Sequence, residues 1–270
     1  MSRFSLFSAL IIFLFGFGVL SQESPAQLSV SPLVLETSVY PGGVKDHSVI
    51  VSNQASETLS CHVTIYAMEL QEGGLPVAVE EAARSCARWI TVEPSRVVLP
   101  PGQAIQLRCR FSVPKGTLGG YYAILSIHGQ PGGADEDAES PTGLRAGIRF
   151  SYRSLLPVLL AVPGGELRAE IHAAQPLVSS EGPGREQRIQ LPVSNSGNIH
   201  ARIRGTAEIR SLANQPIESF ELAAGRGYLL PDHQRIFTQR IKSRLPDGQY
   251  VMNVELTMER SPRPMRKVFD

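Results

Sequence analysis

The stretch VLPPGQAIQLRCRFSVPKGTLGGYYAILSIHG, residues 98–129, has a second version in the same chain, LLPDHQRIFTQRIKSRLPDGQYVMNVELTME, residues 229–259. Both versions read Leu-Pro, turn residues, glutamine, an alternating run, a second proline, glycine, tyrosine and another alternating run. Proline fixes φ and ends a strand, and glycine allows a tight reversal of the chain. Each version therefore predicts the same strand–turn–strand unit, and the repetition predicts two related domains in tandem.

The rest of the chain supports this division. Apolar and polar residues alternate with period two after residue 28, and no long run keeps a helical period. The motif Val-Ser-Asn closes a strand at Asn53 and again, 142 residues later, at Asn195. Short strands with turn signals about every ten residues are typical of Ig-like sandwiches. We therefore expect an all-β protein with two tandem Ig-like β-sandwiches, a first domain over residues 27–163 and a second over 164–260, followed by a basic tail over 261–270.

Three local features refine this picture. The first strand, residues 28–39, contains Pro32, which predicts an edge strand or a strand that switches sheets. The run PVAVEEAARSCARW, residues 76–89, leaves open a helix of three turns. The recurring asparagines and the tyrosines at strand starts, including Tyr121, Tyr122 and Tyr250, fit structural positions in turns and a tyrosine corner. Trp89 is expected in a core or between the domains.

The first 26 residues read as a signal peptide. Arg3 precedes an uncharged apolar run, residues 4–20, and small residues follow at 24–26 or 19–21. The alternative is an uncleaved anchor, because such a run approaches the length of a membrane span. We expect cleavage, and therefore a periplasmic or secreted protein with no membrane span after signal cleavage.

Composition excludes several function classes. The chain is 42% hydrophobic and 19% charged, with a formal net charge of +1. This balance does not favour nucleic acid or an anionic membrane as a partner. Three cysteines, Cys61, Cys86 and Cys109, fall in an exported chain, where disulfides are stable. Cys61 and Cys86 flank Gly73-Gly74 almost symmetrically, so a hairpin there predicts a possible Cys61–Cys86 disulfide, while Cys109 is expected to be a buried free thiol.

No catalytic motif stands out. The six histidines, His47, His62, His128, His172, His200 and His233, lie far apart in the sequence without metal-ligand spacing. The chain has neither a nucleophile elbow nor a phosphate-binding glycine loop. The acidic run ADEDAES, residues 134–140, lacks the ligand order of a calcium loop and is expected to be an acidic surface loop. We expect a protein that is not an enzyme and has no metal, cofactor or small-molecule substrate.

At the level of families, the strand order, the VSN strand end and the stretch WITVEPSRVVLPPGQ resemble bacterial pilus-assembly (fimbrial) chaperones. The stretch NSGNIHARIRGTAEI and the second Leu-Pro unit resemble the Ig-like domains of WxL-interacting cell-surface proteins. The chaperone resemblance implies two Ig-like domains set at an angle and a partner subunit that adds a strand to the last strand of the first domain. It also implies an Arg on the first strand and a Lys on the last that anchor the subunit's terminal carboxylate. This chain departs from that pattern, because residues 28–39 contain no Arg or Lys.

The last strand of the first domain, AGIRFSYRSLLPVLLAVP over 146–163, is the expected binding edge. Its residues predicted to contact a partner are Arg145, Ile148, Arg149, Phe150, Tyr152 and Arg153. Alternation places Arg149 and Arg153 on the face opposite Ile148, Phe150 and Tyr152. The expected function is chaperone-like binding of a cell-envelope or pilus-type subunit by strand addition. The alternative is a structural or adhesive envelope module that binds a surface protein or wall polymer without a chaperone cycle, in keeping with the WxL-interacting resemblance.

Overall fold

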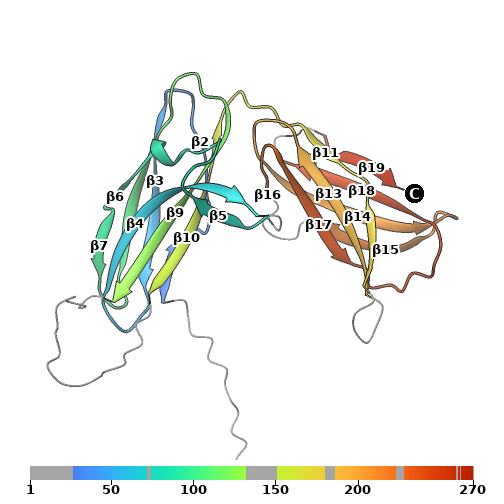
Figure 1. Ribbon diagram of the computed structural model, residues 1–270, viewed down its shortest axis with the longest axis horizontal. Helices are drawn as coiled ribbons and strands as arrows, with labels where there is room; N and C mark the ends of the chain where they lie inside the picture. Colours follow the sequence, from blue (N-terminus) through green and yellow to red (C-terminus); the bar gives the residue numbers. More distant parts are fainter. Residues whose placement is uncertain are drawn as a thin grey trace, which may run out of the picture.

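The structure is a computed structural model that describes residues 27–71, 74–131, 151–179, 186–222, 228–259, 261 and 263–269. These residues form two elongated β-sandwiches that are inclined to each other and joined at one end (Figure 1). The fold is therefore all-β with two tandem sandwiches, as the repeated sequence predicts. Among the described residues, no helix is long and apolar enough to cross a membrane.

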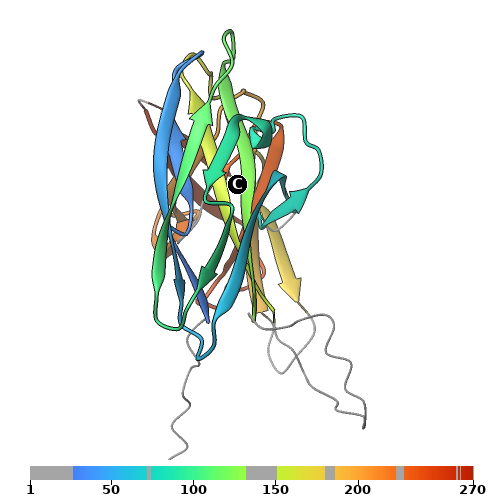
Figure 2. The same cartoon turned by 90° about the vertical axis from the view of Figure 1, so that its left-hand side faces the viewer.

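The described residues of the first domain form ten strands in two sheets, which face each other across its core (Figure 2). One sheet has the order β1-β3-β8-β6, and the other has the order β2-β10-β9-β4-β5, with β7 also paired to β4. The strands are β1 (Leu28–Ser31), β2 (Leu35–Ser38), β3 (Val44–Asn53), β4 (Leu59–Leu70), β5 (Pro76–Val79), β6 (Ile90–Glu93), β7 (Arg96–Leu99), β8 (Ala104–Ser112), β9 (Gly119–Pro131) and β10 (Tyr152–Val162).

The second domain repeats the plan with shorter strands. Strands β11 and β12 pair with β13, whose other edge pairs with β17; β14 lies between β15 and β18, with β16 also on β14 and β19 on β18. The strands are β11 (Ala169–Ile171), β12 (Gln175–Ser179), β13 (Glu186–Asn195), β14 (Ala201–Ser211), β15 (Pro216–Leu222), β16 (Tyr228–Leu229), β17 (His233–Arg240), β18 (Tyr250–Met258) and β19 (Met265–Phe269).

In several strands, alternation buries one face and exposes the other. In β8, Leu107, Cys109 and Phe111 point into the first core and the residues between them are exposed. The second domain has its own cluster, which includes Leu191, Ile203 and Leu256. Each fully buried Leu, Ile or Phe side chain contributes about 1.5–3 kcal/mol relative to exposure. Two separate cores therefore stabilise the two domains.

The first strand switches sheets, as its proline predicts. Strand β1 pairs antiparallel with β3, and after Pro32 strand β2 pairs parallel with β10 in the opposite sheet. Proline has no backbone N–H to give to a ladder, which suits the point where the chain leaves one sheet for the other.

The two VSN asparagines make equivalent hydrogen bonds in the two domains. The Asn53 amide donates to the carbonyls of Glu57 and Leu99, and its oxygen accepts from the N–H of Ala55. Asn195 donates to Ile199 and accepts from the N–H of Gly197. Both side chains are 1% exposed. The sequence repeat is therefore a repeat of buried hydrogen bonds.

The turns after the two Leu-Pro pairs also correspond. The N–H of Gly102 donates to the carbonyl of Asn53, and the N–H of Asp232 donates to that of Asn195, at 2.9 Å and 2.8 Å. Both donors have a left-handed φ, of 71° and 60°. The tyrosine prediction holds at Tyr250, whose hydroxyl donates to the carbonyl of Pro246 at 2.8 Å.

The structure differs in two places from what the sequence suggested about secondary structure. Residues 76–89 form no α-helix: they contain strand β5 and a 3₁₀ turn over Ala87–Trp89, because the first four residues complete a hairpin with β4. The expected basic tail contains strand β19, which pairs with β18 in the second sandwich. Met265 and Phe269 of this strand pack against the second core, which gives it an apolar side despite its charges.

Candidate functional site

The predicted binding strand, β10, is open along half of its outer edge. Strand β9 pairs with all of β10, from Tyr152 to Val162, but β2 covers the other edge only from Val158 to Ala161. Among the described residues, no strand pairs with the outer edge over residues 152–157. A sheet edge of this kind presents unpaired backbone groups that can accept another strand.

Backbone direction decides which peptide groups face this open edge. The carbonyl of Ala161 accepts a bond from the N–H of Val39, at 3.1 Å, on the β2 side. Because backbone groups alternate in direction along a strand, Arg153, Leu155 and Pro157 also direct theirs outward. Arg153 and Leu155 offer both an N–H and a carbonyl, whereas Pro157 offers only a carbonyl. An added strand would find its donors at residues 153 and 155 and meet β2 beyond residue 157.

Side chains of β10 divide between two faces. Tyr152 packs against the first core, together with Leu156 and Val158, whereas Arg153 is exposed and Leu155 is 42% exposed. This division agrees with the predicted opposite faces of Tyr152 and Arg153. The other predicted contact residues, Arg145, Ile148, Arg149 and Phe150, lie outside the described residues.

An apolar cavity of about 140 Å³ lies beside the end of the open edge, between the two domains. Its lining includes Pro157 and Leu159 of β10, Val34 before β2, and Tyr228 and Leu230 of the second domain. A cavity of roughly 150 Å³ can hold a molecule the size of benzene. One apolar side chain of a bound segment therefore fits between the domains.

Arg235 of β17 lines the same cavity and lies against Gly74 of the β4–β5 turn. Its guanidinium donates to the carbonyl of Tyr228 at 3.1 Å and lies 5.2 Å from the ring centroid of Phe237. Burial lowers the pKa of Arg235 below its ordinary value. The cavity thus has one half-buried cation, and it comes from the second domain, not from the first strand.

A polar cluster holds the domains together near this cavity. Glu36 of β2 accepts from Arg202 of β14 at 2.9 Å and from the Tyr228 hydroxyl at 3.2 Å. The His200 ring is 1% exposed and lies 3.3 Å from the Tyr122 hydroxyl and 3.8 Å from Glu36. These contacts with His200, Tyr228 and Arg202 lower the pKa of Glu36 from 4.5 to about 2. The carboxylate therefore stays charged at any physiological pH.

Two consecutive glycines at the start of β9 complete the junction. Gly119 has φ of 94°, and a Cβ there would lie 2.3 Å from the carbonyl oxygen of Asn198 in the second domain. The N–H of Gly120 donates to that same oxygen at 2.7 Å. The sequence GTLGG in the first domain, where the second has only DG, therefore provides the close approach of one domain to the other.

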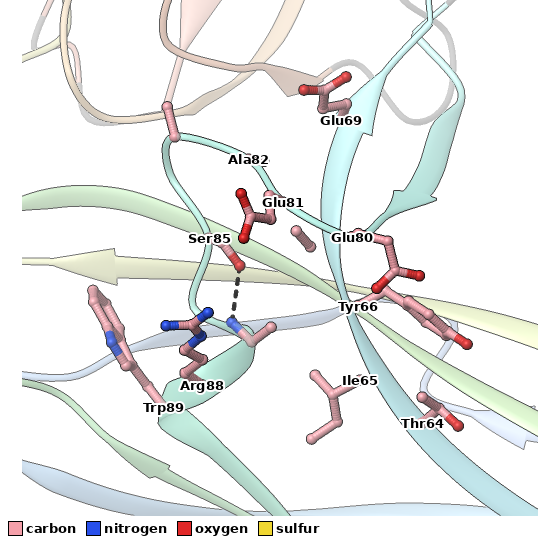
Figure 3. Close-up of a pocket in the computed structure, with 13 residues that line it drawn as sticks. Thr64, Ile65, Tyr66, Glu69, Glu80, Glu81, Ala82, Ser85, Arg88 and Trp89 are labelled. Carbon is pink, nitrogen blue, oxygen red and sulfur yellow. Dashed lines mark hydrogen bonds between the residues drawn. The ribbon is translucent and has the colours of Figure 1, made fainter.

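A larger, open hollow of about 830 Å³ lies at β4, toward the edge of the same sheet that is opposite β10 (Figure 3). It occupies the interval between β7, which pairs with β4 up to His62, and β5, which pairs with it from Ala67. Figure 3 shows Trp89 and Arg88 on one side and Tyr66 on the other, with the Ala87 N–H donating to Ser85 at 3.2 Å. Its carboxylates, Glu69, Glu80 and Glu81, make no ion pair with the described residues.

The predicted Cys61–Cys86 disulfide is not formed, and all three cysteines are free and buried. The β4–β5 hairpin does exist, but β5 ends at Val79 and the chain then leaves the sheet; β7 takes the place beside Cys61, where Val97 is its partner. The N–H of Cys86 instead donates to Tyr122, which lies seven positions along β9 from Gly129, the partner of Cys61. At about 3.3 Å per residue this separates the thiols by roughly 20 Å.

Within the described part of the chain, no three His, Cys, Asp or Glu side chains converge as metal ligands. Sequence reasoning located the binding edge on β10 but not the cavity beside it or the domain junction. The residues that it did not single out there are Leu155, Pro157, Glu36, Arg202 and Arg235. Only the register of the strands and the packing of the second domain bring these residues together.

No protein-family profile matches the chain, and no curated protein matches its sequence. In fold, it is similar to the class 5 fimbriae chaperone CfaA, with a TM-score of 0.49, 11% identity, and 90% of this chain and 99% of that chain covered. It is also similar to the SafB chaperone of Salmonella enterica in complex with the SafA pilin, with a TM-score of 0.46 and 13% identity, covering 90% and 96% of the two chains. A third similar structure is the CupB2 chaperone of Pseudomonas aeruginosa, with a TM-score of 0.44, 13% identity, and 90% and 100% covered.

Proposed function

We propose that this chain is an exported, non-enzymatic, chaperone-like protein that holds a subunit of the cell envelope or of a pilus by strand addition at β10. The observation that carries the proposal is the open outer edge over residues 152–157. There, outward peptide groups at Arg153 and Leu155 have no described partner strand, while Val158 to Ala161 are paired on both sides. Main-chain hydrogen bonds across such an edge supply affinity, and alternate side-chain contacts supply specificity.

The length of the edge limits the partner. Six residues of strand span about 20 Å. An added strand that runs toward Pro157 must stop where β2 begins to pair, at Val158. It would end beside the 140 Å³ cavity, which has room for one apolar side chain. The partner is therefore expected to offer a short, alternating segment that ends in an apolar residue.

Pro157 also explains how the protein can carry an open strand edge without forming a continuous sheet with other molecules. Its ring nitrogen faces outward and cannot donate, so a second molecule cannot pair continuously along β10. Proteins use proline at edges to limit unwanted strand pairing. The edge therefore accepts a short segment and not a long sheet.

The test is a proline substitution that affects only the outer edge. Leu155→Pro removes the outward N–H at 155 but no bond to β9, so we expect the fold to remain and partner capture to be lost. Leu155→Thr keeps the N–H and serves as the matched control. A tagged mature protein would be used to capture partners from a periplasmic extract, with circular dichroism to confirm folding. Equal capture of the same partner by both variants would contradict strand addition.

Co-expression separates this function from an adhesive one. A chaperone should raise the soluble yield of the captured subunit, because it covers surface that otherwise aggregates. An adhesive envelope module should bind the partner without changing its yield. We expect the wild type to raise the yield and Leu155→Pro to leave it at the level without the protein.

A further inference from the structure

Two arginines and two histidines form one row across four neighbouring strands of the first domain. Arg96 of β7 lies opposite His62 of β4, His62 lies opposite His128 of β9, and His128 lies opposite Arg153 of β10. We call Arg96, His62, His128 and Arg153 the basic row. The four residues are far apart in the sequence, and only the register of the sheet brings them together.

The basic row lies on the outer face of the sheet. Residues directly opposite each other on paired strands point to the same face. The next residues on β4 and β9, Cys61 and Ile127, lie in the first core, so the row points away from it. Arg96, His62 and Arg153 are exposed and His128 is half-buried. With strands about 4.8 Å apart, the row is about 14 Å long.

No described carboxylate pairs with any member of the row. Other arginines of this domain have partners: Arg108 and Arg110, for example, both bind Asp46. The positions next to the row on the same face of β4 and β9 are all uncharged: Ser60, Thr64, Ser126 and Gln130. The two guanidiniums at the ends of the row, Arg96 and Arg153, therefore have no described carboxylate to pair with, and an anionic partner could supply one. Two guanidiniums at its ends disfavour a metal cation between the histidines.

We propose that the basic row binds a carboxylate-rich segment of the protein partner, an inference that rests on the proposed function and names the chemistry of that partner. Arg153 connects the two surfaces, because its peptide group faces the open edge of β10 and its side chain belongs to the row. A segment that continues from the added strand reaches the row at Arg153 and crosses the sheet toward Arg96. Four or five extended residues span its length, and arginine binds carboxylates through two parallel hydrogen bonds.

The probe is a fluorescein-labelled ten-residue peptide of alternating threonine and aspartate, with its asparagine analogue as the uncharged control. Fluorescence anisotropy at low ionic strength, with the full mature chain, should show binding of the aspartate peptide only. The double variant Arg96→Gln/Arg153→Gln should weaken it by about two- to thirtyfold, since it removes two exposed ion pairs of about 0.2–1 kcal/mol each. The matched variant Lys115→Gln/Arg204→Gln loses the same charge elsewhere and should bind as the wild type.

Histidine gives the test a second readout. The rings of His62 and His128 lie between Arg96 from β7 and Arg153 from β10, and a ring N–H can donate a hydrogen bond to a carboxylate. His62→Gln/His128→Gln replaces both rings by amides and should weaken binding of the aspartate peptide relative to the wild type. Equal binding by all variants, or equal binding of the asparagine analogue, would overturn the proposal.

Two further experiments show whether the basic row binds something other than a carboxylate-rich segment of the partner. If inorganic polyphosphate competes far better than the aspartate peptide, and only when the row is intact, the occupant is an anionic polymer and the proposal is wrong. If the peptide binds only after Asp135, Glu136, Asp137 and Glu139 are changed to amides, the chain's own acidic segment is the occupant, which also overturns it. Leu155→Pro should leave peptide binding unchanged. Partner capture by Leu155→Pro tests the proposed function, whereas peptide binding by the row variants tests this inference. Failure of the one can therefore be told from failure of the other.

Discussion

Arg202 of the second domain donates a hydrogen bond to Glu36 of the first at 2.9 Å, and the Tyr228 hydroxyl donates to the same carboxylate. The pair lies beside the cavity at the end of the β10 edge. The position of the second domain, and with it the shape of the candidate site, therefore depends on one carboxylate of the switching strand.

Glu36→Gln is expected to loosen this junction and to lower the free energy of unfolding by roughly 1–3 kcal/mol at pH 7. The folded pKa of Glu36 is lowered from 4.5 to about 2. Its contribution is therefore fully present above pH 4.5 and is lost as the pH falls toward 2. Urea unfolding of the two proteins at pH 7 and pH 3 measures this. The exposed substitution Glu255→Gln is the control, and a difference between wild type and Glu36→Gln that grows below pH 4 would contradict the account.

Gly119→Ala is expected to separate the domains without unfolding either of them. Its Cβ would meet the Asn198 carbonyl at 2.3 Å, and φ of 94° is unfavourable for alanine. Small-angle scattering should show a larger radius of gyration and circular dichroism an unchanged strand content. Gly102→Ala also has a left-handed φ, of 71°, but open space around it, and should leave the radius unchanged.

Asn53→Ala and Asn195→Ala should each destabilise their own domain by roughly 2–3 kcal/mol, because each leaves several buried backbone groups unpaired. Trp89 is the single tryptophan of the chain and lies in the first domain, so its fluorescence reports that domain alone. Asn53→Ala should lower the fluorescence midpoint in urea, whereas Asn195→Ala should lower only the midpoint followed by circular dichroism. Exposed Gln54→Ala is the control. Identical shifts in both signals for both variants would show that the domains do not unfold separately.

The three thiols should be unreactive in the folded protein. Burial raises the pKa of Cys61 and Cys86, and raises the pKa of Cys109 to about 11. A thiol reagent at pH 8 should modify none of them before unfolding, and iodoacetamide in denaturant without reductant should modify all three. Two unmodified cysteines under those conditions would show a disulfide that the structure does not contain.

The repeated Leu-Pro units and the VSN motif predict the tandem because they report local turn chemistry. Asn53 and Asn195 form hydrogen bonds with backbone groups that lie a few residues away in the sequence or in the neighbouring turn of the repeated unit. The Cys61–Cys86 prediction is wrong because it extends a hairpin beyond Val79, where β7 replaces β5 beside β4. Strand β19 is not predicted from the sequence because charged residues stand between Met265 and Phe269.

The site itself was only partly predictable. Alternation in the last strand of the first domain places Arg153 outside and Tyr152 inside, as observed. The partial cover by β2, the glycine contact with Asn198 and the basic row depend on which strands are neighbours and in what register. Those relationships join residues separated by 25 to 123 positions, and no local pattern records them.

The central claim is that a partner strand adds to the outer edge of β10, and amide hydrogen exchange tests it most directly. In the free protein the amides of Arg153 and Leu155 should exchange fast, while those of Ser154 and Leu156, directed toward β9, should exchange slowly. Addition of the captured partner should slow Arg153 and Leu155 by at least about tenfold and leave Ser154 and Leu156 unchanged. A bound complex in which Arg153 and Leu155 still exchange as in the free protein would contradict strand addition.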